Sequence, residues 1–171
     1  MGAKIARLEN GYFDAGPAWN TPGNAITIYL RARVPDGDWK YALFAKRGGH
    51  DRVNFNLFSV DLAGTPGTDI GFEICTERGF FQASFPVANI DATAWHDLVG
   101  QYNGQSIRML CDGKVMAQHQ AEGNLAQNSE PILIGAETDG GQVVRPMAGE
   151  IEEAALWTRS LSDDELNILT K

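Results

Sequence analysis

The chain has 171 residues, 43 % of them apolar, and its 14 basic and 22 acidic side chains give a formal net charge of −8. This balance argues against a nucleic-acid partner, because affinity for phosphates comes mainly from clustered lysine and arginine. The apolar fraction is enough for a packed core, but the longest apolar stretches fall far short of the ~20 residues that cross a bilayer. We therefore expect a folded protein without a membrane partner.

The first residues, Met1 to Lys4, run into mixed sequence without the apolar region of a secretory signal peptide. Two interpretations stay open at this point. The chain is either a cytosolic protein or a module taken from a larger secreted protein.

Alternation of apolar and polar side chains predicts strands at 25–32, 53–59 and 70–75. The same pattern recurs at 95–102, 106–111 and 114–117, where Asn103-Gly104 and Asp112-Gly113 separate the segments. These dipeptides favour type I′ hairpin turns, which need a positive φ at both central residues. Short strands at this spacing, with 19 glycines in the chain, predict an antiparallel two-sheet sandwich over residues 1–171 as one domain.

The end of the chain has the pattern of a short helix. Ser162 and Glu165 are spaced as a capping box, and Leu161 and Leu166 are placed to form a hydrophobic staple. A helix of barely two turns must pack on the sandwich to be stable.

The two cysteines, Cys75 and Cys111, lie in apolar strand-like contexts without the spacing of a metal-binding motif. Buried thiols are the favoured interpretation, and a bridge between neighbouring strands is the alternative. The histidines, His50, His96 and His119, also lack the spacing of a zinc motif.

A series of short motifs, at 95–99, 102–104, 110–115, 131–135, 149–153 and 157–166, resembles the laminin-G-like, concanavalin-A-like jelly-roll superfamily. Upstream, 44–51, 56–59 and 71–73 resemble modules appended to family 32 glycoside hydrolases, which are related to family 66 carbohydrate-binding modules. The resemblance implies an all-β jelly roll with a short C-terminal helix, non-catalytic and secreted as part of a larger enzyme. It further implies binding to terminal fructose of a β-fructan of the levan type.

Sugar recognition needs planar hydrogen-bonding groups around a shallow pocket, which arginine, carboxylate and amide side chains provide. Asn56 and Glu73 lie between apolar neighbours on predicted strands, so they point to the opposite, ligand-facing side of the sheet. Glu137 follows a predicted strand end. The predicted ligand-binding residues are Arg47, His50, Asp51, Arg52, Asn56, Glu73 and Glu137.

Tryptophan side chains are the other candidates for sugar contacts. Trp95 and Trp157 match core positions of the resembled pattern. Trp19 and Trp39 stand in stretches that contain proline or glycine, and are the candidates for exposed stacking platforms.

No cofactor is expected, although related sandwiches often hold a structural calcium ion through carboxylates and carbonyls. Asp14 and Glu152 are the predicted ligands if the two ends of the chain pair. Glu152 stands where the resembled pattern usually has aspartate, which puts such a site in doubt.

Two other functions remain as alternatives to a carbohydrate-binding module attached to a hydrolase. One is a laminin-G-like adhesion module that binds protein. The other is a glucanase-like enzyme that uses Glu150 and Glu152, but the third carboxylate of the glucanase pattern is replaced by Ala155.

Overall fold

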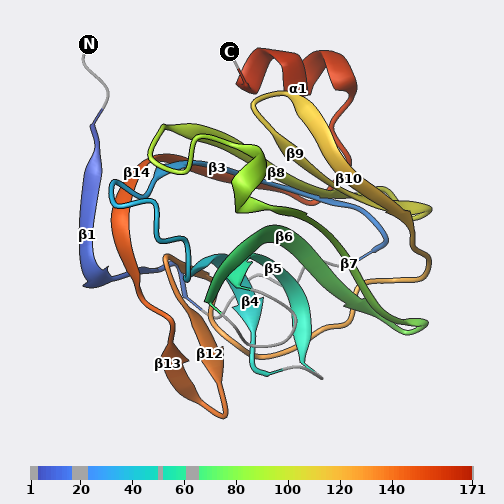
Figure 1. Cartoon of the computed structure of the whole chain (residues 1–171). Coiled ribbons are helices and arrows are strands. Elements are labelled where there is room, and N and C mark those ends of the chain that lie inside the picture. The colour runs from blue at the N-terminus through green and yellow to red at the C-terminus, as the bar shows by residue number, and fades with distance from the viewer. Residues whose placement is uncertain (1–3, 17–22, 50–51, 61–65, 171) are drawn as a thin grey trace.

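The computed structural model describes residues 4–16, 23–49, 52–60 and 66–170, which form two six-stranded antiparallel sheets packed face to face (Figure 1). The first sheet has the order β1 (Ala6–Gly11), β14 (Met147–Trp157), β3 (Ile26–Arg33), β8 (His96–Tyr102), β9 (Ser106–Cys111) and β10 (Lys114–Gln120). The second has the order β2 (Phe13–Asp14), β11 (Leu133–Ile134), β4 (Ala42–Arg47), β5 (Val53–Val60), β6 (Pro66–Thr76) and β7 (Gly79–Pro86).

Three smaller elements complete the described chain. β12 (Glu137–Asp139) and β13 (Gln142–Val144) form a separate hairpin beside β4, and a 3₁₀ turn, η1 (Val87–Asn89), follows β7. The helix α1 (Asp163–Leu169) lies near the C-terminus (Figure 1). The predicted all-β jelly-roll sandwich with one short C-terminal helix is confirmed. None of the described helical segments is long and apolar enough to cross a bilayer.

The core lies between the two sheets and is built from the alternating positions predicted from the sequence. Ile26, Ile28 and Leu30 on β3 are fully buried there. The second sheet supplies the opposing layer, which includes Phe55, Leu57, Ile70, Phe72 and Ile74. Because period-two alternation puts one set of side chains inward, the other set on the same strands must face outward.

Both predicted hairpins form, but only one has the predicted turn. Asp112 and Gly113 have φ values of 50° and 76°, as a type I′ turn requires. The other hairpin uses a longer turn in which the Asn103 side-chain oxygen accepts hydrogen bonds from the backbone N–H groups of Gln105 and Ser106. There only Gly104 has a positive φ. The type I′ prediction was therefore wrong at Asn103-Gly104, since the asparagine side chain closes this turn instead.

The capping box of α1 is confirmed. Ser162 Oγ accepts from the backbone N–H of Glu165, and the Glu165 carboxylate accepts from the backbone N–H of Ser162. Leu161 and Leu166 are buried together in a second apolar cluster with Tyr29, Val99 and Leu110. The helix is therefore held against the outer face of the first sheet.

The cysteines lie in different sheets. Cys75 is on β6 of the second sheet and Cys111 is at the end of β9 in the first, and the structure places no disulfide between them. A bridge between neighbouring strands is excluded by this arrangement. Cys111 is buried, as predicted, whereas Cys75 is half-buried.

Two predictions for the tryptophans were wrong, namely that Trp39 is exposed and that Trp95 lies in the core. Trp39 is fully buried, and its Nε1–H donates to the carbonyl of Ala92, so it is no sugar platform. Trp95 is half-buried outside the core, with the guanidinium carbons of Arg31 and Arg33 at 5.7 and 5.3 Å from its ring centre. Trp157 packs on the second apolar cluster, and Trp19 lies outside the described residues.

Gly100 on β8 sets the spacing between the sheets at one point, because any Cβ there would overlap the ring of buried Phe72. We predict that Gly100→Ala lowers the free energy of unfolding by about 1–3 kcal/mol, the usual cost of overpacking a core. Denaturant unfolding monitored by circular dichroism measures this. Gly11→Ala is the matched control, since the nearest atom to its added Cβ would be Leu8 Cδ2 at 3.6 Å. Equal stability of the two variants would contradict the prediction.

Candidate binding site

The outer face of the second sheet carries a cluster of polar side chains that are mostly shielded from water. It consists of Arg47 at the end of β4, Asn56 on β5, Glu73 on β6, Glu137 at the start of β12 and Arg145 just after β13, and we call it the arginine–glutamate cluster. Strand pairing creates it, because Asn56 is the cross-strand partner of Glu73. The β12–β13 hairpin adds Glu137 and Arg145 by lying beside β4, which carries Arg47.

Glu137 is the centre of the cluster, with 1 % of its surface exposed. Arg47 Nη1 donates to both of its carboxylate oxygens, at 2.8 and 2.7 Å. Arg145 Nη2 donates to Oε1, and Asn56 Nδ2 donates to Oε2 at 2.9 Å. A buried carboxylate is tolerated only with such compensation, because an unpaired charge away from water costs several kcal/mol.

Glu73 joins the cluster from the neighbouring strand. Its Oε1 accepts from Asn56 Nδ2 at 3.0 Å and lies 3.4 Å from Arg47 Nε. Glu73 is 6 % exposed, so its side chain is largely shielded from solvent on the face that the sequence predicted to bind the ligand. The two arginines and two glutamates of the cluster carry formal charges that cancel.

Four buried polar atoms around this cluster have no hydrogen-bond partner within the described part of the chain. Two are donors, Arg47 Nε and Arg145 Nε, and two are acceptors, Asn56 Oδ1 and Gln82 Oε1. Gln82 on β7 is the cross-strand partner of Glu73, so its side chain stands on the same face. A buried polar atom left without a partner costs about 1–3 kcal/mol, and a concentration of them is typical of a place that water or a ligand completes.

Burial lowers the pKa of Arg145, and the positive charge of Arg47 lowers it further, while Glu73 opposes the shift. Arg145 is also about one-third exposed, at 36 % of its side chain, whereas Arg47 is 14 % exposed. Arg145 therefore forms the outer rim of the cluster, where a ligand arriving from solvent would meet it first.

Of the seven predicted ligand-binding residues, four converge in the cluster: Arg47, Asn56, Glu73 and Glu137. Arg52 does not, because its guanidinium bonds to Glu130 Oε1 at 3.1 Å and to the carbonyl of Gly48. It lies beside the β12–β13 hairpin, since Thr138 donates to the other oxygen of Glu130. His50 and Asp51 lie outside the described residues.

The structure places the two predicted calcium ligands in different sheets. Asp14 is on β2 in the second sheet and accepts from the backbone N–H of Gly16 at 2.7 Å. Glu152 is on β14 in the first sheet and binds Arg31 Nε at 2.6 Å. The ends of the chain do pair through β1 and β14, but the chain has crossed to the other sheet before Asp14. The pairing of the two ends therefore does not bring these two carboxylates onto the same sheet.

The glucanase alternative finds no support in the arrangement of Glu150 and Glu152. Each carboxylate is held by an arginine of β3, Glu150 by Arg33 at 2.5 and 2.8 Å and Glu152 by Arg31. A glycosidase needs one carboxyl group as a proton donor and the other as a nucleophile. In the structure both carboxylates are engaged by guanidinium groups of the neighbouring strand.

Sequence analysis missed Arg145 and Gln82. A signal for Arg145 existed, because Gly140-Gly141 is a turn dipeptide that pairs Glu137 with Val144 and so brings Arg145 to the same end of the hairpin. Nothing local distinguishes Gln82, whose place depends on the register between β6 and β7.

We predict that Glu137→Gln lowers the free energy of unfolding by about 3 kcal/mol or more, because two largely buried guanidinium groups lose their counter-charge. Thermal and denaturant unfolding measure the change. Glu122→Gln removes the same charge at an exposed position and should shift stability by less than about 0.5 kcal/mol. Similar stability of both variants would show that the cluster is solvated and energetically neutral.

The fold is shared with carbohydrate-active proteins of known structure. NanB sialidase from Streptococcus pneumoniae superimposes with a TM-score of 0.71 at 18 % identity, covering 99 % of this chain and 28 % of the sialidase. The Ruminococcus gnavus IT-sialidase CBM40, solved with α2,3-sialyllactose, gives 0.72 at 16 % identity, covering 99 % of this chain and all of the other. The leech intramolecular trans-sialidase gives 0.65 at 14 % identity, with 99 % and 28 % coverage.

At these identities the likeness concerns the fold alone, and the chain spans little more than a quarter of each of the two whole sialidases. A sequence search of curated proteins gave no match. The profile of one family, described as the concanavalin A-like lectin/glucanases superfamily, matches residues 9–167. Because this match covers nearly the whole chain, the protein belongs to the concanavalin A-like lectin/glucanases superfamily.

Proposed function

We propose that the protein is a non-catalytic carbohydrate-binding module that holds the terminal residue of an oligosaccharide at the arginine–glutamate cluster. The observation that carries the proposal is the set of four buried polar atoms, two donors and two acceptors, that form no hydrogen bond within the described residues and belong to the arginine–glutamate cluster or to Gln82, the cross-strand partner of Glu73. A sugar hydroxyl both donates and accepts a hydrogen bond, so neighbouring hydroxyls complement such a set.

The charge of the cluster favours a neutral sugar. Glu137 already neutralises Arg47 and Arg145 through close hydrogen bonds, and Glu73 adds a second negative charge beside Arg47. An anionic sugar would have to compete with these carboxylates for the guanidinium groups. The terminal fructose of a levan-type β-fructan, the ligand implied by the sequence resemblance, meets the requirement for a neutral polyhydroxyl group.

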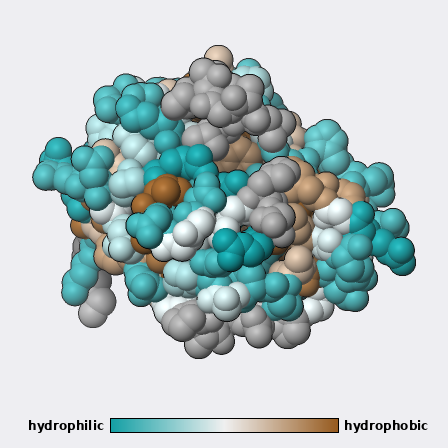
Figure 2. Space-filling model, turned by 90° about the horizontal axis from the view of Figure 1, so that it is seen from below, coloured by the Kyte–Doolittle hydropathy of each residue, from teal (hydrophilic) through white to brown (hydrophobic). Residues whose placement is uncertain are grey.

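The surroundings also fit a polar ligand. The face seen from below in Figure 2 is mainly hydrophilic, and apolar residues gather only in small patches on its described part. A protein-binding surface would be expected to expose a larger contiguous apolar patch. On this one face, the observation favours a polar ligand over a partner that binds through an apolar patch.

Such a module would act by proximity. Attached to a glycoside hydrolase and secreted with it, the module would raise the effective concentration of the enzyme at its polysaccharide without any chemistry of its own.

Sialic acid is the rival ligand, because the R. gnavus CBM40 was solved with α2,3-sialyllactose and shares this fold. Its carboxylate would have to displace Glu137 or Glu73 from an arginine. Calorimetric titration with levan-type oligosaccharides and, separately, with α2,3-sialyllactose decides between the two. We expect heat from the fructan only.

Gln82→Ala tests the position of the site, because it removes an unpartnered acceptor without breaking any hydrogen bond to its Oε1 atom. We predict about tenfold weaker fructan binding, equivalent to about 1.4 kcal/mol, with unchanged thermal stability. Gln118→Ala, on an exposed position of β10 in the other sheet, should leave the affinity unchanged. The absence of heat with the native protein, or equal affinities in all three proteins, would refute a fructan site here.

A further inference from the structure

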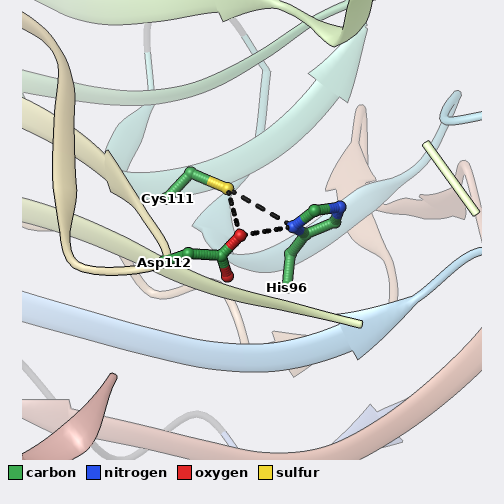
Figure 3. A group of neighbouring side chains, drawn as sticks. All are labelled: His96, Cys111 and Asp112. Atoms are coloured by element: carbon green, nitrogen blue, oxygen red, sulfur yellow. Dashed lines mark hydrogen bonds and ion pairs between the residues drawn. The ribbon is translucent and has the colours of Figure 1, made fainter. Parts of the chain in front are cut away.

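Three side chains that are separate from the arginine–glutamate cluster converge beside the first sheet: His96, Cys111 and Asp112 (Figure 3). His96 begins β8, Cys111 ends β9, and Asp112 is the first residue of the type I′ turn that follows. Antiparallel pairing of β8 with β9 brings the start of one strand to the end of the other, so residues fifteen or sixteen positions apart meet.

The donor atoms of these side chains face one another. His96 Nδ1 lies 2.8 Å from Asp112 Oδ2, and Cys111 Sγ lies 3.6 Å from both atoms. His96 and Cys111 are 4 % and 3 % exposed, while the Asp112 side chain is 51 % exposed. The cluster is therefore anchored in the protein and open to solvent on one side.

The hydrogen bond made by the other ring nitrogen of His96, Nε2, orients the ring so that Nδ1 faces the cluster. Nε2 is 2.8 Å from the carbonyl oxygen of Asp91, and a carbonyl only accepts, so Nε2 carries a proton. Metal-binding histidines commonly donate their second N–H to a backbone carbonyl in this way, which sets the ring orientation and tautomer. In neutral His96 the lone pair is then on Nδ1, directed at Cys111 and Asp112.

The spacing of the donors can be compared with a tetrahedral zinc site. With Zn–S near 2.3 Å and Zn–N and Zn–O near 2.0–2.2 Å, neighbouring ligand atoms are about 3.5–3.6 Å apart when one is sulfur and about 3.3 Å apart otherwise. The two distances from Cys111 Sγ already have this value. Only Nδ1 and Oδ2 must separate, by about 0.5 Å, to make room for the ion.

We propose that His96 Nδ1, Cys111 Sγ and Asp112 Oδ2 form a binding site for Zn²⁺, with water as the fourth ligand on the exposed side of Asp112. Imidazole and thiolate are ligands that zinc accepts, whereas calcium requires oxygen ligands only. The site is independent of the arginine–glutamate cluster and of the calcium pair considered above.

Binding of Zn²⁺ leaves the net charge of the site unchanged. Nδ1 and Oδ2 at 2.8 Å share one proton in the metal-free site, since both would otherwise present lone pairs to each other. Cys111 Sγ donates to Asp112 Oδ2 at 3.6 Å, so the thiol also carries a proton. Zinc displaces both protons to solvent, and its two positive charges balance the thiolate and the carboxylate.

The experiment starts from the whole chain treated with a chelator and dialysed. Calorimetric titration with Zn²⁺ should give one ion per chain, and titration with Co²⁺ should produce a thiolate-to-metal charge-transfer absorption. Titration with Ca²⁺ should give no heat from this site. The absorption band reports the sulfur ligand directly, so it does not depend on any activity of the protein.

Two variants test the ligands. Cys111→Ser should abolish the charge-transfer band, and Asp112→Asn should weaken Zn²⁺ binding by at least about 100-fold, because losing a direct ligand should cost no less than losing an outer-shell partner. Asn is suited to the positive φ of position 112, so the second variant keeps the turn. It therefore remains informative if Cys111→Ser fails to fold.

Two matched controls remove the same kinds of side chain elsewhere. Cys75→Ser changes the other thiol, and His119→Gln changes a histidine that is exposed on β10. Neither should affect the stoichiometry or the band. Failure of the native chain to take up Zn²⁺, or unchanged uptake in both Cys111→Ser and Asp112→Asn, would overturn the proposal.

Discussion

The strands β4, β5 and β6 are buried on both faces, and this constraint governs the candidate site. Their inward residues fill the core, but outward residues such as Asn54, Asn56 and Glu73 are also less than 10 % exposed. A sheet that faces water on one side can leave its outward polar groups to the solvent, whereas this one cannot. Asn54 donates to the carbonyl of Ala126, and the β12–β13 hairpin supplies Glu137, which accepts from Asn56.

The fold was largely predictable from local patterns. Alternation located β3, β5, β8 and β9, and the spacing of Ser162 and Glu165 located the start of α1, because these signals depend on residues close in sequence. The same logic put Asn56 and Glu73 on one face. It could not reveal that this face is covered, because the cover is a hairpin about eighty residues downstream.

What sequence analysis missed depends on pairing between distant segments. The expected approach of Asp14 to Glu152 was wrong because the chain leaves the first sheet after β1 and enters the second at β2. For His96, Cys111 and Asp112 the error was the reverse, because the sequence predicted no cluster and the structure forms one. Their spacing matches no metal motif, yet the register of β8 with β9 assembles them. Motif spacing describes ligands on one loop or helix, and a sheet can assemble ligands without it.

The contact between Gly100 and Phe72 also affects how the protein can respond to a ligand. With no side chain between backbone and ring, the two sheets meet at van der Waals contact there, and a close-packed interior transmits strain rather than yielding to it. Sliding of one sheet over the other, the shear motion that many proteins use on binding, would drive the ring into the β8 backbone. Any adjustment to an arriving sugar must therefore come from side chains at the rim, such as Arg145, and from the β12–β13 hairpin. Binding of this kind stays local, and a module that only anchors an attached partner needs no other response.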